Sequence, residues 1–255
     1  MIGLGSLTRL LSASLLAIGI SAAAPLAHAD FTEDERLEIG EIVKDYLLDN
    51  PEVLRDAFIE LQRRETAALQ EQQRDALREY RDRIENAPGM PVVGNPEGDV
   101  TLVEFFDYNC PYCSHALADL RDLLNADPNV RVVLFEMPIL GEGSVETARV
   151  SLAAARQGNY LELHSALLGA RGQKNEARAL QIAEALGFDM ERLRRDMEDP
   201  EIMAIIQNAV ALAQEIGING TPSYVVGDQI LGGMQSFAAL RSAVEEVREA
   251  ACETC

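Results

Sequence analysis

One stretch of the sequence specifies the fold: Val100-Thr101-Leu102-Val103-Glu104-Phe105-Phe106-Asp107-Tyr108-Asn109-Cys110-Pro111-Tyr112-Cys113. Its first half is mostly apolar and β-branched, which predicts a buried strand. The polar residues that follow are those expected at a turn and at a helix N-cap. A helix is predicted next from apolar residues at helical spacing, namely Ala116, Leu117, Leu120, Leu123 and Leu124. Cys110 is therefore expected where a strand passes into the first turn of a helix, and Pro111 fits the first helical position, which needs no N–H.

This placement of Cys110 has a chemical consequence. The first N–H groups of a helix have no intrahelical acceptor, and the aligned peptide dipoles put partial positive charge at that end. A thiolate is stabilised there. Cys113, one turn further along, can attack a mixed disulfide formed at Cys110 and release the partner. We therefore predict thiol–disulfide exchange, and the alternatives are a structural disulfide or half of a zinc site.

The length and composition limit the other classes of function. A chain of 255 residues holds one large domain or two smaller ones, and a hydrophobic content of 47% is ample for a packed core. The net charge is -20, from 22 basic and 42 acidic residues, and this argues against a nucleic-acid-binding protein. The predicted chemistry needs two thiols, and no cofactor is expected.

Residues 1–29 have the pattern of a secretory signal peptide. Arg9 precedes an apolar core at residues 10–20, and Ala27-His28-Ala29 supplies the small-x-small cleavage pattern before Asp30. An uncleaved membrane anchor is the alternative. No other stretch approaches the roughly 18 apolar residues of a membrane span. We therefore predict a periplasmic protein in an oxidising compartment.

Residues 30–88 are predicted to form a helical oligomerisation arm. Thr32 with Glu35 makes a capping-box pattern, and Asn50-Pro51 marks the start of a second helix that runs to Asn86. A helix this long and polar is not expected to bury itself within one small domain. The alternative is a solvated helix folded back on its own domain. The apolar stripe consists of Ile39, Ile42, Val43, Tyr46, Leu47, Leu54, Phe58, Leu61, Leu77, Tyr80 and Ile84.

Residues 89–251 are predicted to form an α/β catalytic domain. A short strand at Val92-Val93 precedes the central strand and its helix, and residues 131–137 form a further strand. Strand, helix and strand in this order predict a parallel pair with a crossover. The helical segment at about 144–217 is interpreted as an inserted subdomain, in which Asn175, Asp189 and Asp199-Pro200 are the expected starts of helices. Residues 221–226 and 229–231 then form a hairpin, and a last helix runs from residue 237 to about 251.

Further candidates outside the CxxC motif are Glu104, the segment Gly220-Thr221-Pro222, and two histidines. Glu104 lies inside the apolar strand, and burial would raise its pKa and let it exchange a proton with Cys113. A partly exposed Glu at a sheet edge is the alternative. Gly220-Thr221-Pro222 opens the late strand, where a cis X–Pro bond would present backbone groups to a substrate chain, and an ordinary loop is the alternative. For His115 a surface helix position is favoured, and for His164 packing or capping.

A second CxxC, Cys252-Glu253-Thr254-Cys255, ends the sequence. A tail carrying a disulfide is one interpretation of this pair. The others are a four-cysteine zinc site made with the first pair, a relay to the active site, and capture of a soft metal such as Cu(I).

Three features together resemble the DsbA-like family of exported thiol–disulfide oxidoreductases. They are the Phe105-Phe106 strand that leads into Cys110-Pro111-Tyr112-Cys113, the helical insertion, and Gly220-Thr221-Pro222. The arm resembles the ScsC-like, copper-sensitivity-suppressor branch through Tyr46-Leu47-Leu48-Asp49-Asn50-Pro51-Glu52-Val53-Leu54. The resemblance implies a thioredoxin fold. It also implies that Cys110 is the nucleophile, Cys113 the resolving thiol, Glu104 the buried acid, and Pro222 the cis proline facing the cysteines.

The same resemblance implies partners and a direction of exchange. Pro111, Tyr112, Thr221 and Pro222 would contact substrate, and Tyr112 replaces the histidine of strongly oxidising members, so an isomerase or reductase is favoured. The expected partners are cysteine-containing exported proteins, a membrane redox partner that resets the active site, and further copies of the chain in a dimer or trimer. A dithiol oxidase, a copper-binding or copper-resistance protein, and an inert scaffold remain as alternatives.

Overall fold

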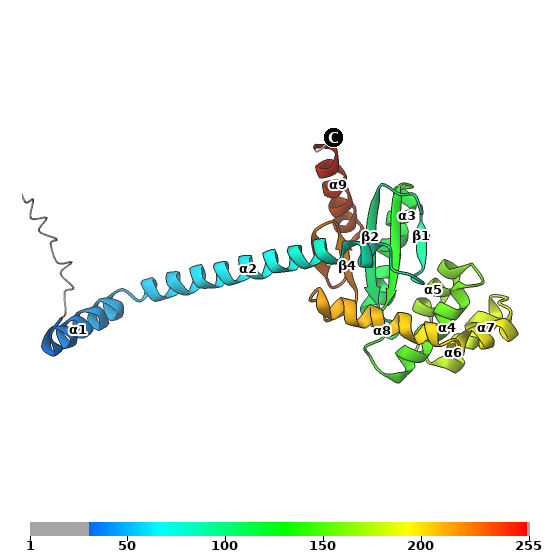
Figure 1. The fold of residues 1–255 in the computed structure, drawn as a ribbon, viewed down its shortest axis with the longest axis horizontal. Helices are drawn as coiled ribbons and strands as arrows, with labels where there is room; N and C mark the ends of the chain where they lie inside the picture. Colours follow the sequence, from blue (N-terminus) through cyan, green and yellow to red (C-terminus); the bar gives the residue numbers. More distant parts are fainter. Residues whose placement is uncertain (1–30, 254–255) are drawn as a thin grey trace, which may run out of the picture. The chain divides into compact units, whose positions relative to one another are not determined.

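The computed structural model describes residues 31–253, so the predicted signal peptide lies outside the described residues (Figure 1). The chain divides into two compact units, Met1–Leu61 and Gln62–Cys255.

The first unit contains helix α1 (Glu33–Asp49) and the start of helix α2 (Glu52–Glu85). The predicted capping box is confirmed: the Glu35 N–H donates to Thr32 Oγ1 over 3.3 Å, and the Thr32 N–H donates to Glu35 Oε2 over 2.8 Å. None of the α1 residues is buried. The apolar residues of this unit are instead exposed to solvent, among them Ile42, Val43, Tyr46, Leu54, Phe58 and Leu61.

The second unit is built on a five-stranded mixed sheet with strand order β1-β3-β2-β4-β5. The strands are β1 (Val92–Gly94), β2 (Val100–Phe106), β3 (Val130–Glu136), β4 (Ser223–Val226) and β5 (Gln229–Gly232). β2 and β3 are parallel, and the other neighbours are antiparallel. The predicted parallel pair and the predicted hairpin are therefore both confirmed. The architecture is a thioredoxin-like fold.

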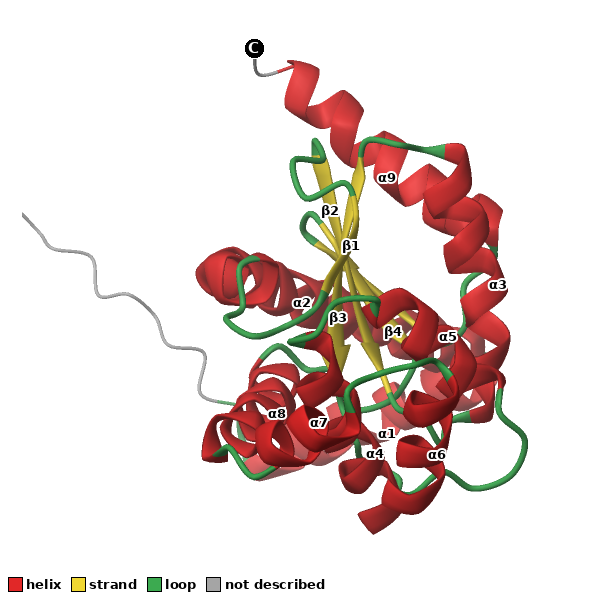
Figure 2. Cartoon of the chain, turned by 90° about the vertical axis from the view of Figure 1, so that its right-hand side faces the viewer, coloured by secondary structure: helices red, strands yellow, loops and turns green. Residues whose placement is uncertain are grey.

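Helices cover both faces of this sheet, which Figure 2 shows edge-on. Helix α3 (Pro111–Ala126) forms the crossover between β2 and β3, and it packs beside α9 (Phe237–Glu253) on one face. Helix α8 (Pro200–Glu215) packs against β3 on the other face. Both faces of β2 and β3 are consequently buried, as expected for parallel strands whose sequences are almost continuously apolar.

The second half of α2 belongs to this unit. Leu77 and Ile84 are only 2% and 1% exposed, and both join the core. Arg78 and Arg81 form ion pairs with Asp228. The second compact unit therefore begins within α2, whereas the sequence predicts the start of the catalytic domain at residue 89. The physical reason is that Leu77 and Ile84, two apolar residues of a mostly polar helix, are enough to attach α2 to the sheet domain.

Five helices occupy the chain between β3 and β4 and together form the helical block. They are α4 (Glu142–Ala155), α5 (Tyr160–Gly169), α6 (Glu176–Ala185), α7 (Met190–Met197) and α8. α4 is central and packs against the other four. The predicted helix starts are confirmed, since the side chains of Asn175, Asp189 and Asp199 accept hydrogen bonds from N–H groups of α6, α7 and α8. α5 also contacts α3, and this contact joins the helical block to the helix that follows Cys110.

Within residues 31–253, no helix combines the length and the apolar character that crossing a bilayer requires.

The burial of Leu77 predicts that the second half of α2 stabilises the sheet domain. Leu77→Ala should lower the free energy of unfolding by roughly 2–5 kcal/mol, the usual range for truncating a buried leucine. Leu69 lies on the same helix and is 57% exposed. Leu69→Ala should therefore change the free energy of unfolding by no more than about 0.5 kcal/mol. Urea denaturation of both variants measures the difference, and equal effects would contradict the packing of α2 in the core.

Candidate active site

Cys110 lies at the junction of strand and helix, where the sequence predicts it. It is the N-cap residue of α3, with an extended backbone (φ -78°, ψ 118°), and Pro111 follows in the first turn. The Ser114 N–H donates to the Cys110 carbonyl over 3.2 Å and so begins the helix. Both cysteines are free thiols, with Cys110 4% exposed and Cys113 fully buried. Cys110 is therefore the sulfur that an approaching reagent meets first.

The Thr221-Pro222 segment lies against Cys110. The peptide bond between these residues is cis, as the resemblance implies. The Cys110 Sγ–H donates to the Thr221 carbonyl oxygen over 3.3 Å. The structure thus brings together two predicted site residues that are 111 positions apart in the sequence.

Glu104 is buried beneath the cysteines, so a partly exposed position at a sheet edge is wrong. It is 1% exposed and lies opposite Tyr224 in the antiparallel pairing of β2 with β4. The Tyr224 hydroxyl donates to Glu104 Oε1 over 3.3 Å, and Oε2 has no partner. Burial raises the pKa of Glu104 to about 8, although the hydrogen bond from Tyr224 acts in the opposite direction. The side chain is consequently a carboxylic acid at neutral pH, able both to give and to accept a proton.

Burial also raises the pKa of the Cys113 thiol, and the charges of Cys110 and Glu104 raise it further. A backbone hydrogen bond from Asp107 acts in the opposite direction. Cys113 is therefore held as a neutral thiol, and it must lose a proton before it can attack a disulfide. Cys110 and Glu104 are therefore the two predicted site residues whose charges act on Cys113, and Glu104 is the carboxylic acid of the two.

The loop between β2 and α3 is held by side chains to which the sequence assigned only turn chemistry. Asp107 is buried, and its carboxylate accepts the Asn109 N–H over 2.7 Å and the Leu140 N–H over 3.0 Å. The Asn109 side chain bonds across to the backbone of Lys174, in the loop between α5 and α6. These contacts link the residues just before Cys110 to the helical block.

A third buried acid, Glu136, is not among the residues predicted from the sequence. It is 1% exposed at the end of β3, where burial raises its pKa to about 8. The Tyr160 hydroxyl donates to its carboxyl group over 3.2 Å. The only signal in the sequence is an acid that ends an otherwise apolar strand, a pattern that also fits a strand leaving the core. The same polar cluster includes Tyr108, Ser151 and His164.

The histidines considered as candidates, His115 and His164, lie outside the reacting centre. His115 is exposed on α3, as favoured from the sequence. His164 is fully buried and packs against Phe106 and Tyr160, so its interpretation as a packing residue is confirmed. Burial lowers the pKa of His164 to about 3, which keeps the ring neutral.

Pro111 and Tyr112 point outward from the first turn of α3. Both are exposed, and 63% of the Tyr112 surface faces solvent. The second pair of cysteines falls outside the described residues, since Cys255 is not described and neither is the side chain of Cys252. Within the described part of the chain, no group of three or more His, Cys, Asp and Glu side chains is arranged to hold a metal ion.

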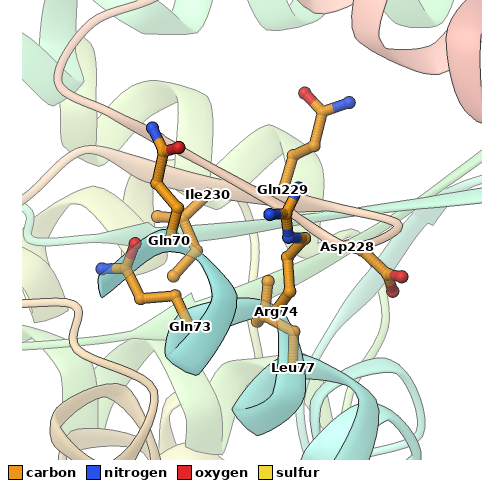
Figure 3. Close-up of a pocket in the computed structure, with 7 residues that line it drawn as sticks. All are labelled: Gln70, Gln73, Arg74, Leu77, Asp228, Gln229 and Ile230. Carbon is orange, nitrogen blue, oxygen red and sulfur yellow. The ribbon is translucent and has the colours of Figure 1, made fainter. Parts of the chain in front are cut away.

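A pocket of about 350 Å³ lies apart from this set of residues (Figure 3). Gln70, Gln73, Arg74 and Leu77 of α2 line one side of it, and the β4–β5 hairpin lines the other. None of its lining residues belongs to the predicted site.

Comparisons with known proteins agree with this geometry. A family model described as a DSBA-like thioredoxin domain matches residues 101–245, more than half of the chain. The model of the copper resistance protein ScsC N-terminal domain matches residues 35–68. The chain is also 33% identical over 155 residues to an Na(+)/H(+) antiporter NhaA from Salinispora arenicola, covering 60% of this chain. It spans only about a quarter (24%) of that relative's length.

Solved structures give the same assignment. A thioredoxin-like oxidoreductase from Silicibacter pomeroyi is 54% identical, with a TM-score of 0.64, over 66% of this chain and 98% of that one. A linker-deletion mutant of ScsC from Proteus mirabilis is 26% identical, with a TM-score of 0.66, over 88% of this chain and all (100%) of that one. With a matching family model on each side of residue 100 and a dithiol at the N-terminus of α3, this chain belongs to the DsbA-like thioredoxin family and carries an ScsC-type N-terminal domain.

Proposed function

We propose that this protein exchanges disulfide bonds in exported proteins, with Cys110 as the nucleophile and with isomerisation or reduction as its preferred direction. One observation carries the proposal: Cys110 Sγ lies at the N-terminus of α3 and 3.3 Å from the Thr221 carbonyl oxygen. The N-terminus of a helix stabilises a thiolate. Thr221 lies just before β4, where a substrate backbone can run beside the attacking sulfur.

The exchange begins when the Cys110 thiolate attacks one sulfur of a substrate disulfide. A bond forms between Cys110 Sγ and that sulfur, the substrate S–S bond breaks, and the other substrate sulfur leaves as a thiolate. In isomerisation the freed thiolate attacks another disulfide of the same substrate, and a substrate thiolate later displaces Cys110. The oxidation states of enzyme and substrate are then unchanged at the end of the cycle.

In reduction, Cys113 ends the reaction instead. Its thiol gives up a proton to Glu104 in the ionised form, and its sulfur attacks Cys110 Sγ. The Cys110–Cys113 disulfide forms, the mixed disulfide breaks, and the second substrate thiolate leaves. The enzyme is oxidised by two electrons and the substrate is reduced, so a membrane redox partner must return the enzyme to the dithiol.

The preference for isomerisation over oxidation is supported by the residues around the cysteines. Tyr112 is exposed beside Cys110, and no ionisable imidazole occupies its place in the CxxC motif. The periplasm is the proposed compartment, in keeping with the leader-like sequence of residues 1–29.

We also propose that the N-terminal unit joins copies of this chain into a dimer or trimer. Apolar residues of α1 and of the start of α2 are exposed, with Phe58 74% and Leu54 55% accessible. An exposed apolar stripe of this kind indicates an interaction surface. The match of residues 35–68 to the ScsC N-terminal model makes a second copy of this chain the proposed occupant.

The proposed reaction is tested with a substrate containing scrambled disulfides. Cys252 and Cys255 are changed to Ser in every variant, so that only the Cys110 pair can react. Active substrate should be recovered with the Cys110 pair intact and not after Cys110→Ala, because that change removes the nucleophile. Cys113→Ala should instead accumulate a mixed disulfide, which mass spectrometry detects. Recovery that persists in Cys110→Ala would contradict the proposal.

The proposed proton transfer by Glu104 predicts a dependence of stability on pH. A buried acid with a pKa of about 8, against 4.5 in the unfolded chain, keeps its proton in the folded state only. The contribution of Glu104 to stability should therefore fall as the pH rises from 5 to 8, by up to about 1.4 kcal/mol per pH unit. Glu104→Gln should remove this contribution, and Glu79→Gln, at an exposed site, should keep it. Urea unfolding at pH 5 and pH 8 measures it, and identical slopes in all three proteins would refute a buried acid at Glu104.

The oligomerisation arm is tested by placing charge on the apolar stripe. Leu54→Glu with Phe58→Glu should give monomers by light scattering, because a charge buried between copies costs more than the contact gains. Gln62→Glu with Thr66→Glu has the same spacing and the same added charge on exposed polar positions of the helix, and should keep the assembled mass. An unchanged mass in the first variant would argue against the arm.

A further inference from the structure

The backbone of Lys174 is hydrogen-bonded to the side chain of Asn109, the residue that precedes Cys110. Its N–H donates to Asn109 Oδ1 over 2.7 Å, and its carbonyl accepts from Asn109 Nδ2 over 3.0 Å. The same Nδ2 donates to Ser144 Oγ at the start of α4 over 3.1 Å. One side chain of the active-site loop thus holds two separate parts of the helical block.

The chain around Lys174 is held independently of its side chain. A Cβ atom on Gly143 would lie 2.6 Å from the Lys174 carbonyl oxygen, so α4 and this segment meet backbone to backbone. On the C-terminal side, the Glu176 N–H donates to the Glu146 carboxylate over 3.1 Å, and Arg149 pairs with Glu176 over 2.5 Å. Substitution of the Lys174 side chain should therefore leave the path of the loop intact.

The Lys174 side chain is buried although both neighbours in the sequence, Gln173 and Asn175, are exposed. The residue is 6% accessible. Burial lowers the pKa of its ammonium group, while the negative charges of Asp107, Cys110 and Cys113 act to raise it. A lysine is rarely buried without charges that compensate it. Here Asp107 of the active-site loop acts most strongly in this sense, followed by Cys110 when it is a thiolate.

We propose that Lys174, whose backbone is fixed by Asn109 next to Cys110, is a positioning residue of the active site, and that its buried side chain stabilises the Cys110 thiolate and so favours the dithiol form of the protein. The inference rests on the proposed role of Cys110 as nucleophile. In the disulfide form the sulfurs carry no negative charge. The ammonium therefore lowers the free energy of the reduced protein only. Lys174 belongs to the helical block, whereas the thiols lie at the start of α3.

The chain contains a matched control, because it has two lysines only and the other, Lys44, is exposed on α1. The variants are Lys174→Met, which removes the charge, Lys174→Arg, which keeps it, and Lys44→Met. Two quantities are measured on the full chain. The first is the pH dependence of Cys110 alkylation by iodoacetamide, followed by mass spectrometry of the peptide that holds Cys110. The second is the equilibrium in which the dithiol and glutathione disulfide give the Cys110–Cys113 disulfide and two glutathione thiols.

Lys174→Met should slow alkylation at least about threefold below the midpoint of the pH profile, and move that midpoint to higher pH, because half a pKa unit is about threefold in thiolate population. It should displace the glutathione equilibrium toward the disulfide by a similar factor. Lys174→Arg and Lys44→Met should both resemble the wild type.

Each other outcome has a definite meaning. A wild-type profile in Lys174→Met, with unchanged glutathione equilibrium, would overturn the role of Lys174 while leaving the redox function standing. Equal losses in Lys174→Met and Lys174→Arg would overturn it too, since the charge would then not be the cause. Failure of wild-type Cys110 to react at all would overturn the redox function and Lys174 with it. Far-UV circular dichroism and the urea midpoint confirm that each variant is folded before it is compared.

Discussion

The antiparallel pairing of β2 with β4 is the constraint on which the site depends. Its register runs from Leu102 opposite Val226 to Phe105 opposite Ser223. Because β4 begins just after Pro222, this register leaves Thr221 at the end of β2, beside the start of α3. A shift by one residue would turn every side chain of β4 to the other face and would separate Tyr224 from Glu104. The contact between Cys110 and Thr221 is thus a consequence of strand pairing between distant parts of the chain.

Burial explains why the two sulfurs differ. Cys110 caps α3 and keeps some contact with solvent, while Cys113 lies one turn further in and has none. A buried thiol resists ionisation, and the acid next to it resists ionisation for the same reason. In the proposed reaction the core would supply the proton-exchanging pair, and the N-terminus of α3 would hold the more accessible of the two sulfurs. The two roles follow from depth in one helix rather than from different chemistry of the two residues.

The helical block is also part of the surroundings of the active-site loop. It contacts α3 through α5, and it reaches the loop before Cys110 through Asn109 and Lys174. A buried polar cluster also connects the block to this loop and to the sheet, since His164 of α5 hydrogen-bonds to Tyr108 and Tyr160 of the same helix donates to Glu136 at the end of β3. An insertion between β3 and β4 thereby becomes part of the environment of a motif that precedes it in the sequence, and the contacting residues Asn109 and Lys174 are 65 positions apart.

Local pattern in the sequence was sufficient for the strand–loop–helix that carries Cys110, for the capping residues Asn175, Asp189 and Asp199, and for the hairpin at Gly227-Asp228. These features depend on residues within a few positions of one another, where the physical rules act directly. The burial of Glu104 and Glu136, the attachment of α2 through Leu77, and the position of Lys174 were decided by the tertiary structure alone. Each is a contact between distant segments, and the residue types involved occur as often on surfaces, so only the packed fold distinguishes a buried acid or lysine from a solvated one.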